Sequence, residues 1–319
     1  MTGKEPTVSE IQRILRKVDR ECADGRTLSA VCADRGLDTG LVRQWLDRYC
    51  AAPNMGETLS ESPLLKAVFP IFLAPDDDDP SQQIGSGVLL AIGEEVFALT
   101  AAHVTDASNK GTLLMPASDA ITAIIGHFSH NPSFANSMRA ADKIDMAYFR
   151  LDRELSSRLH PSFRPATVDN LQLTDNLETG DFFTFAGFPW RKTKASPNTQ
   201  ESDLTTFTGH TLSADDYAKL GYDRSLHVVV RVRRKKTFSH RYQSRQTAPH
   251  PAGVSGGGVF SWPRTLRERS NSPALKLAAI AHSFHPNNHC LAATRVVLYV
   301  EAILRNNPHL QEHFAHCMP

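Results

Sequence analysis

The sequence predicts a mostly β protein preceded by a small three-helix domain, and three features of the chain lead to this fold class. Short apolar runs bounded by glycine, proline and polar turn residues recur from residue 64 onward, as in antiparallel sheets. The first fifty residues instead place apolar side chains at helical spacing. A polar stretch with proline, glycine, serine and threonine separates the two parts. We therefore expect a helical module at 1–50, a linker at 51–63 and a β domain at 64–319.

Three short helices are expected in the N-terminal module. The first spans Val8 to Cys22, with apolar residues on one face: Ile11, Ile14, Leu15 and Val18. Thr27 caps a second helix that Gly36 closes, and Asp38 precedes a third. Three short helices with a tight glycine-containing turn form the helix-turn-helix plan. The run from Leu28 to Tyr49 resembles transposase-type helix-turn-helix modules.

Arg43, Gln44 and Arg48 on the third helix are the candidate DNA-contacting residues of this module. Asp47 lies among them, and basic and acidic residues nearly balance over 1–50. Binding to the phosphate backbone normally needs an excess of lysine and arginine. The charge balance favours a protein-interaction module slightly, and both DNA and a protein remain open as partners.

Four later segments define the expected β domain. Residues 84–92 and 96–99 form a hairpin with Gly93 in its turn. Residues 182–189 make a buried strand that glycine and proline stop, and residues 277–284 make another strand. Residues 294–306 form a C-terminal helix that is expected to pack on the second half of the domain.

Three segments carry side chains suited to acyl transfer. The glycine-rich stretch around Ser255 is a turn whose backbone N–H groups can converge on an oxyanion. An apolar strand ending in small residues leads to His103, at a position suited to a general base. Asp145 begins another largely apolar strand, where a carboxylate can orient an imidazole.

On Thr100–His103, Asp145–Ala147 and Gly253–Gly257 the chain resembles the chymotrypsin-like (trypsin-fold) serine peptidases of the bacterial, intracellular, disulfide-free type. The order His, Asp, Ser matches this family and differs from the order in subtilisins and α/β-hydrolases. The resemblance spans about residue 64 to the C-terminus. It implies two packed, six-stranded antiparallel barrels with the site in the cleft between them.

The resemblance also implies a mechanism. Ser255 Oγ attacks the scissile carbonyl while His103 takes its proton, and Asp145 holds the imidazole in the correct tautomer. The N–H groups of Gly253 and Ser255 form the oxyanion hole. Val254 stands where zymogens of the family carry an aspartate, so activation through a newly cut N-terminus paired at this position is not expected.

Substrate-contacting residues are expected at His282, Ser283 and Phe284, because the family's substrate-pairing strand follows the nucleophile at about this distance. Pro249 stands where many members place the base of the primary pocket, so no carboxylate is evident for lysine or arginine. Phe284 stands where the family often has glycine, which favours small or modest apolar side chains. A role for Phe284 as an ordinary core aromatic is equally compatible with the sequence.

Composition limits the remaining possibilities. A net charge of +1 gives no general attraction to nucleic acid or membranes, and no apolar run reaches bilayer length. Five cysteines without metal-ligand spacing, and an N-terminus without the apolar core of a secretory signal, favour a cytoplasmic protein with reduced thiols. No metal or other cofactor is expected. The run Asp76–Asp79 is most consistent with a solvated loop, with calcium as a minor alternative.

Three function classes follow. The first is an intracellular serine endopeptidase that acts on a protein or peptide and is targeted or regulated by its N-terminal module, a plan that resembles bacterial defence peptidases with small helical adaptors. The second is a DNA-binding regulator with an associated peptidase domain. The third is a catalytically inactive trypsin-fold scaffold, which the complete His, Asp, Ser set argues against.

Overall fold

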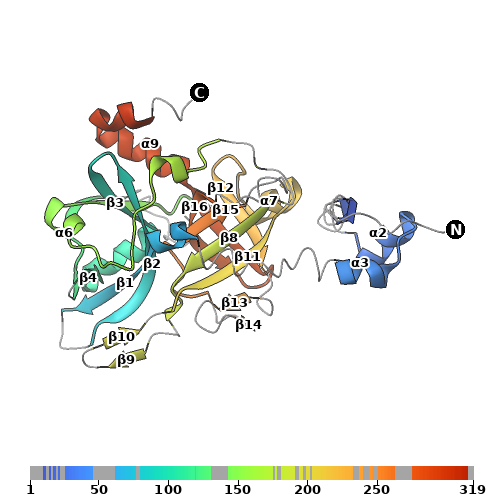
Figure 1. Ribbon diagram of the computed structural model, residues 1–319, viewed down its shortest axis with the longest axis horizontal. Helices are drawn as coiled ribbons and strands as arrows, with labels where there is room; N and C mark the ends of the chain where they lie inside the picture. Colours follow the sequence, from blue (N-terminus) through green and yellow to red (C-terminus); the bar gives the residue numbers. More distant parts are fainter. Residues whose placement is uncertain are drawn as a thin grey trace.

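The structure is a computed structural model. It describes residues 26–45, 62–76, 80–118, 120–130, 143–174, 177, 181–190, 194–196, 199–201, 203–232, 237–239, 244–246, 251–262 and 275–314, together with residues 10, 11, 14, 15, 17, 18 and 21. Two antiparallel sheets dominate it, as the sequence predicts (Figure 1).

The first sheet has seven strands in the order β5-β4-β1-β2-β3-β7-β6. Their bounds are β1 (Val68–Pro75), β2 (Gln82–Ile92), β3 (Glu95–Thr100), β4 (Gly111–Pro116), β5 (Ile121–Ala123), β6 (Gly126–His130) and β7 (Ala147–Leu151). The sheet curls, and the chain passes from one edge to the other through Ile124 and Ile125. The N–H of Ile124 donates to the carbonyl of Leu113 on β4, and the carbonyl of Ile125 accepts the N–H of Asp152 just after β7.

Six strands of the second sheet close into a barrel, because β12 pairs with both β17 and β11. The ring runs β12-β17-β16-β15-β8-β11, and β13 and β14 extend the sheet beyond β11. The bounds are β8 (Phe182–Gly187), β11 (Thr205–Thr211), β12 (His227–Val232), β13 (Thr237–Ser239), β14 (Ser244–Gln246), β15 (Gly258–Ser261), β16 (Lys276–His285) and β17 (Cys290–Arg295). β9 (Lys194–Ser196) and β10 (Thr199–Glu201) form a separate pair.

The expectation of two six-stranded barrels is therefore correct for the second sheet and wrong for the first. Within the described residues the first sheet has seven strands and no pairing closes it. The chain passes directly from edge strand β5 to edge strand β6 through Ile124 and Ile125. The two edges of this sheet are therefore joined by the covalent chain and not by a ladder of hydrogen bonds between β5 and β6.

The expected hairpin is present as β2 and β3, paired from Val88–Leu99 to Ile92–Glu95. Gly93 in its turn has φ +59°, a conformation that side chains other than glycine rarely adopt. A Cβ added there would lie 2.4 Å from Nε2 of His313, a side-chain atom that can move aside, so it is the turn geometry that favours glycine. The hairpin directs the chain after β3 toward the junction of the two sheets.

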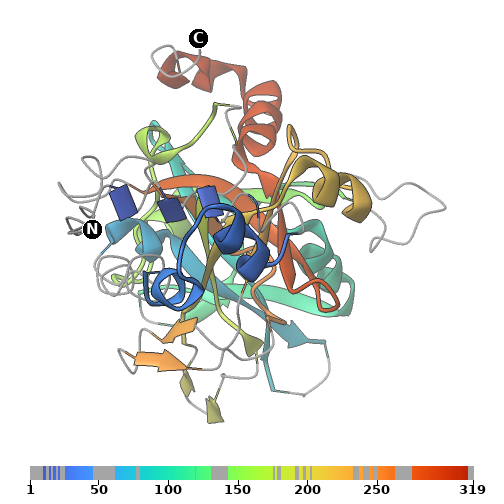
Figure 2. The same ribbon diagram turned by 90° about the vertical axis from the view of Figure 1, so that its right-hand side faces the viewer.

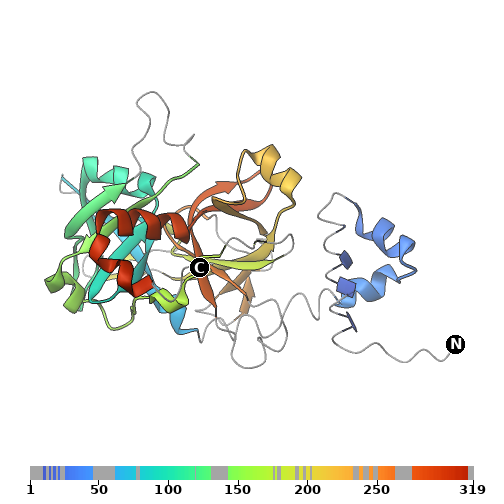
Figure 3. The same cartoon turned by 90° about the horizontal axis from the view of Figure 1, so that it is seen from above.

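The C-terminal helix α9 (Val296–Asn306) packs against both sheets, whereas the sequence predicted packing on the second one (Figures 2 and 3). Its buried residues share one core with residues of β2, β3, β15 and β16; these helix residues are Val296, Tyr299, Val300, Ile303 and Leu304. Burying each such side chain contributes about 1.5–3 kcal/mol. The helix thereby holds the two halves of the domain together.

Short helices fill the connections of the domain: η2 (Pro63–Ala67), α5 (Ala102–Thr105), η3 (Asp106–Lys110), α6 (Arg153–Ser157), η5 (Val168–Asn170), α7 (Ala214–Leu220) and η8 (Pro308–Phe314). The N-terminal module contains α2 (Leu28–Asp34) and α3 (Thr39–Trp45). As expected, Thr27 caps α2 by accepting the N–H of Ala30 at 3.2 Å, and Gly36 follows with φ +62°.

The first expected helix of the module falls on a segment that is only partly described. Its described residues are helical, and three of them are buried together with residues of α2 and α3: Ile11, Leu15 and Val18 with Val31, Cys32 and Val42. The three-helix domain as a whole, like the linker at 51–63, stays a prediction.

Candidate active site

Strand pairing brings His103 and Asp145 together. β3 ends at Thr100, and α5, which carries His103, follows almost at once. Asp145 lies just before β7, whose first residue, Ala147, pairs with Thr100. Because β3 and β7 are antiparallel, the residues after one strand and before the other meet at the same end of the sheet.

Two hydrogen bonds join the Asp145 carboxylate to His103. The backbone N–H of His103 donates to Oδ1 at 2.9 Å, and Nδ1 pairs with Oδ2. The Asp145 side chain is 6% exposed and the His103 side chain 38% exposed, so the carboxylate is sealed while the imidazole stays accessible. Burial disfavours the charged carboxylate, but the hydrogen bonds and charge of His103 outweigh it and lower the pKa of Asp145. A carboxylate that accepts from Nδ1–H leaves Nε2 of the imidazole as a base.

Ser255 lies in a tight turn that leads into β15. The N–H of Gly257 donates to the carbonyl of Val254 at 2.8 Å within this turn. Gly256 has φ +85°, and a Cβ added there would lie 1.9 Å from the carbonyl oxygen of Ser86. Glycine is therefore required for the turn to approach the first sheet so closely.

Ser86 of β2 attaches this turn to the first sheet. Its N–H donates to the carbonyl of Ser255 at 2.8 Å. Its Oγ donates to the carbonyl of Gly253 at 2.8 Å and accepts the N–H of Phe188 at 2.9 Å. Its carbonyl accepts the hydroxyl of Thr100 at 2.8 Å. One buried residue thus connects the end of β3 to the turn of the second barrel.

The backbone around Gly253 leaves two N–H groups unused. Gly253 has φ +94°, and a Cβ added there would lie 2.6 Å from the nitrogen of Trp190 and 2.8 Å from the carbonyl oxygen of Phe188. The N–H groups of Gly253 and Ser255 donate no hydrogen bond to any described residue. They are available to a negatively charged oxygen outside the chain.

The structure does not join Ser255 to His103 by a hydrogen bond within the described residues. Instead, Ser255 Oγ donates to the carbonyl of His282 at 3.3 Å. The two segments do approach each other at β2, where a Cβ added at Gly85 would lie 2.7 Å from Cγ1 of Val104 and 3.2 Å from the carbonyl oxygen of Ser255. Bonds of this kind are often long or misaligned in the absence of substrate.

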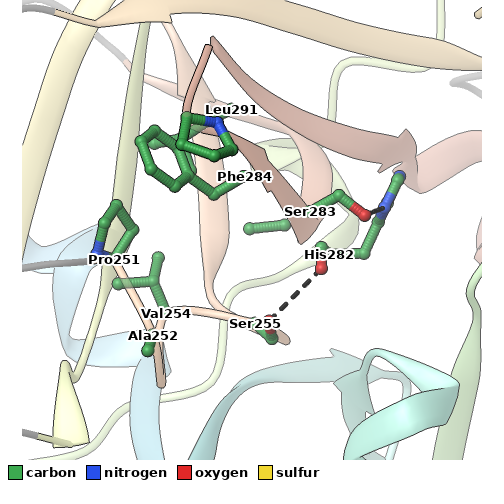
Figure 4. Close-up of a pocket in the computed structure, with 10 residues that line it drawn as sticks. Pro251, Ala252, Val254, Ser255, His282, Ser283, Phe284 and Leu291 are labelled. Atoms are coloured by element: carbon green, nitrogen blue, oxygen red, sulfur yellow. Dashed lines mark hydrogen bonds between the residues drawn. The ribbon is translucent and has the colours of Figure 1, made fainter. Parts of the chain in front are cut away.

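A pocket of about 270 Å³ opens beside Ser255 (Figure 4). The predicted substrate-contacting residues His282, Ser283 and Phe284 line it, and all three belong to β16. A register shift between Ala281 and Ser283 interrupts the pairing of β16 with β17. The other described residues of the wall are Pro251, Ala252, Val254, Ala281, Pro286 and Leu291. Phe284 and Leu291 lie on one side, and Pro251 and Val254 lie on the other.

His282 is buried next to the candidate site. Its Nδ1 pairs with Ser283 Oγ at 2.9 Å, and its Nε2 has no hydrogen-bond partner among the described residues. The ring centroids of Tyr222 and His227 lie 6.1 Å and 6.2 Å from that of His282. Burial lowers the pKa of His282 to about 3, so its ring is neutral near pH 7.

Val254 packs into the apolar core of the second barrel with Phe183 and Phe185 and is only 2% exposed. The residue before Ser255 is therefore an apolar anchor of the turn. This apolar side chain has no charge to offer a newly cut N-terminus, and the absence of that route of activation stays a prediction.

Sequence reasoning missed two residues that position the site, Ser86 and Tyr299. The hydroxyl of Tyr299 on α9 donates to the carbonyl of Thr100 at 2.8 Å, at the end of the strand that leads to His103. Ser86 had a signal in the sequence, since it is a polar residue between two glycines inside an apolar strand. Tyr299 had no such signal, because its partner lies 199 residues away.

Several predicted residues lie wholly or partly outside the described residues. Arg43 and Gln44 belong to α3, but the structure describes only their backbone, and Arg48 is not described. Pro249 also falls outside, as does most of the run Asp76–Asp79. Cys32 and Cys290 are free and buried.

The described part of the chain contains no group of three or more His, Cys, Asp or Glu residues arranged to hold a metal ion. None of its helices is long and apolar enough to cross a membrane.

No protein-family model and no curated protein match the chain. Solved structures with a related arrangement include a serine endoprotease from Yersinia pestis, at 13% identity and TM-score 0.43, with 79% of this chain and 67% of that chain covered. A Glu endopeptidase in complex with MPD has 13% identity and TM-score 0.42, with 76% and 91% covered. Neuropsin, a serine protease expressed in the limbic system of mouse brain, has 16% identity and TM-score 0.45, with 77% and 96% covered.

Proposed function

We propose that the protein is a serine endopeptidase that works through an acyl-enzyme. The observation that supports this proposal is that the segment carrying the His103–Asp145 pair and the turn carrying Ser255 both lie against β2 at Gly85, and that two N–H groups of this turn have no partner among the described residues. In this proposal His103 is the base, Asp145 is the carboxylate that orients it, Ser255 supplies the hydroxyl and the two N–H groups are the donors for an oxyanion. Acyl transfer needs these parts.

The proposed first step begins when a substrate enters and the Ser255 hydroxyl turns from the carbonyl of His282 toward His103. Oγ then attacks the scissile carbonyl carbon while Nε2 of His103 takes the hydroxyl proton. The new positive charge on the imidazole is stabilised by Asp145, whose lowered pKa keeps it ionised. His103 passes the proton to the leaving amine, and water later attacks the acyl-enzyme with the same histidine as base.

The proposed oxyanion hole consists of the N–H groups of Gly253 and Ser255. In the attack step the carbonyl oxygen gains negative charge, and it is this charge that the two donors stabilise. One such donor typically contributes about 2.7–4 kcal/mol to the transition state. Ser86 positions these donors without contacting the substrate, because it hydrogen-bonds to the carbonyls of both Gly253 and Ser255.

A second candidate function, a catalytically inactive scaffold, is favoured by one observation. Ser255 Oγ is bonded to a backbone carbonyl and not to the imidazole. In a scaffold this arrangement would persist in the presence of substrate. In an endopeptidase the bond is exchanged for one with His103.

The N-terminal module is proposed to recruit a protein partner and so to target or regulate the peptidase in the cytoplasm. Its described arginines support a protein partner over DNA, because Arg26 and Arg35 are both occupied by acidic residues. Arg26 pairs with Glu21 at 2.6 Å and also contacts Asp34, and Nε of Arg35 lies 3.0 Å from Glu21. A paired guanidinium has less to gain from a phosphate.

Cleavage of an unfolded protein such as reduced, alkylated casein tests the proposal. The full-length wild type is expected to release peptides, and Ser255→Ala, purified in parallel, is expected to release none. Equal release by both proteins would show a contaminating protease, and no release by wild type over a range of pH would favour the scaffold.

A further inference from the structure

The pocket beside Ser255 carries a further inference, which rests on the proposed function and concerns the substrate. We propose that this pocket takes an uncharged, apolar side chain of leucine to phenylalanine size from the residue that precedes the scissile bond. The proposal stands on the position of the pocket, the chemistry of its walls and its volume.

The pocket lies where the side chain of the residue before the scissile bond would be placed. Ser255 itself lines the pocket, and the carbon that its Oγ attacks is bonded directly to the α-carbon bearing the preceding side chain. With the carbonyl oxygen on the N–H groups of Gly253 and Ser255, that side chain needs a cavity adjoining the serine. Among the described residues, the pocket formed by β16 and the 251–255 turn meets this need.

The walls are apolar on both sides. Pro251, Ala252 and Val254 come from the turn before the nucleophile. Opposite them lie Phe284 of β16, Leu291 of β17 and Pro286 of the turn between these strands. None of the described residues that line the pocket carries a charge at pH 7, because His282, the titratable one, is buried and neutral. A carboxylate, ammonium or guanidinium entering this pocket would lose water without gaining an ionic partner from these residues.

The volume of the pocket limits the size of the substrate side chain that it can hold. A closed apolar cavity of about 150 Å³ can hold a benzene molecule. The pocket, at about 270 Å³, is larger and half-open, so it admits a branched aliphatic side chain or a phenyl ring. Alanine would leave most of it unfilled. Each unfilled methylene generally costs about 10-fold to 200-fold in specificity.

Phe284 is the residue of this wall best suited to a test. Phe284 pairs with Leu291 across β16 and β17 and is half-buried. Leu291 is only 3% exposed and belongs to the core of the second barrel, so a change there would disturb the fold. A charge placed at position 284 can reach water in the free protein, but it would face a side chain in the pocket. Phe284→Asp should therefore convert the apolar pocket into one that attracts a cation.

The experiment uses the full-length protein and a panel of peptidyl diphenyl phosphonates that differ only at the side chain next to phosphorus. In the reaction the serine oxygen bonds to phosphorus, one phenoxide leaves and the serine proton is released with it as phenol. Rates of Ser255 modification are compared for Ala, Leu, Phe, Lys and Glu analogues. An alkyl fluorophosphonate without a side chain reports the reactivity of Ser255 independently of the pocket.

The Leu and Phe analogues are expected to react at least about 10-fold faster than the Ala analogue and about 100-fold faster than the Lys and Glu analogues. In Phe284→Asp the ratio of Lys to Leu rates should rise about 10-fold or more, and Phe284→Ala should reduce the Leu rate without raising the Lys rate. Phe128→Asp, which replaces an exposed phenylalanine on β6 of the other sheet, should keep the wild-type profile.

The outcomes separate the two proposals. If the fluorophosphonate modifies Ser255 but the Lys or Glu analogue is fastest, or all analogues react equally, the apolar pocket is wrong and the endopeptidase proposal stands. A profile shifted equally by Phe128→Asp and Phe284→Asp would also overturn the assignment of the pocket. If neither the fluorophosphonate nor any phosphonate modifies Ser255, the proposed function fails and the pocket assignment fails with it.

Discussion

The two halves of the candidate site differ in how completely their polar groups are satisfied. On the side of the first sheet, the buried carboxylate of Asp145 accepts two hydrogen bonds from His103. On the side of the second barrel, the N–H groups of Gly253 and Ser255 have no partner among the described residues. Under the proposed function, the first half would hold a base in place, and the second would keep donors open for the negative charge of a reacting substrate.

Hydrogen bonds join the two halves of the candidate site. Ser86 connects the end of β3 to the Ser255 turn by hydrogen bonds, and Tyr299 of α9 holds the same strand end through the carbonyl of Thr100. A site split between two sheets depends on such links, because a displacement of about 1 Å can cost about 100-fold in rate.

The largest loss of activity is expected from a change on the side of the first sheet, where Asp145 is fully hydrogen-bonded to His103. Asp145→Asn keeps the size of the side chain but loses its charge, so Nδ1 of His103 is no longer held as a donor. Steady-state hydrolysis of an apolar peptide substrate should fall about 10⁴-fold in kcat. Asp215→Asn, an exposed aspartate in α7, serves as the control and should retain full activity. A fall of less than about 10-fold in Asp145→Asn would remove the carboxylate from the mechanism.

The next effect concerns the open half. Gly253→Ala adds a Cβ 2.6 Å from the nitrogen of Trp190, which forces the backbone to shift and misdirects an oxyanion donor. We expect kcat to fall about 10²-fold to 10³-fold with a smaller change in KM, since the donor acts on the transition state. Circular dichroism and a thermal melt establish that the variant is folded. Unchanged kcat in a folded variant would mean that this N–H takes no part.

A smaller effect is expected at the link between the halves. Ser86→Ala removes a hydroxyl that donates to the carbonyl of Gly253 and accepts the N–H of Phe188. Activity should fall about 10-fold to 100-fold through loss of alignment. Ser157→Ala, at an exposed serine, is the matched control. If Ser86→Ala loses activity only in proportion to its unfolded fraction, Ser86 is structural and does not align the site.

The smallest effect is on stability. Because the pKa of His282 is lowered from 6.5 to about 3, the unfolded chain binds a proton between these values that the folded protein does not. Stability is then fully present above about pH 6.5 and declines toward pH 3, by at most about 1.36 kcal/mol per pH unit from this group. His282→Phe should flatten the pH dependence of the unfolding free energy, measured by urea titration.

The unfolding free energy of His282→Phe should still fall somewhat as the pH is lowered, because the lowered pKa values of Asp145 and His227 act in the same direction. Replacing the exposed His127 by alanine should leave the wild-type slope intact. An identical slope in wild type and His282→Phe would contradict the burial of a neutral His282.

The sequence predicted those parts of the molecule that depend on local pattern and on strand order. The spacing of apolar residues and the positions of glycine and proline predicted the β2–β3 hairpin, the strand β8 and the helix α9. The meeting of His103 with Asp145 was expected from the family resemblance, and the pairing of Thr100 with Ala147 accounts for it. These features rest on short-range preferences or on one strand pair.

The features that were not predicted depend on distant contacts. In the first sheet, Ile124 and Ile125 connect the two edge strands directly. The spacing of apolar residues along the sequence does not predict this connection. The links made by Ser86 join residues 102 and 167 positions apart, and the burial of His282 depends on neighbours from other strands. The state of the Ser255 hydroxyl depends on a carbonyl exposed by a register shift in β16.

The most direct test of the account is to find which residue a fluorophosphonate modifies on the native, full-length protein. After reaction, digestion and mass spectrometry should locate one added phosphonyl group on Ser255, and Asp145→Asn should slow its formation by orders of magnitude. Modification that is absent from the native protein, or that occurs on another serine with Ser255 intact, would contradict the claim that the two sheets assemble a nucleophile.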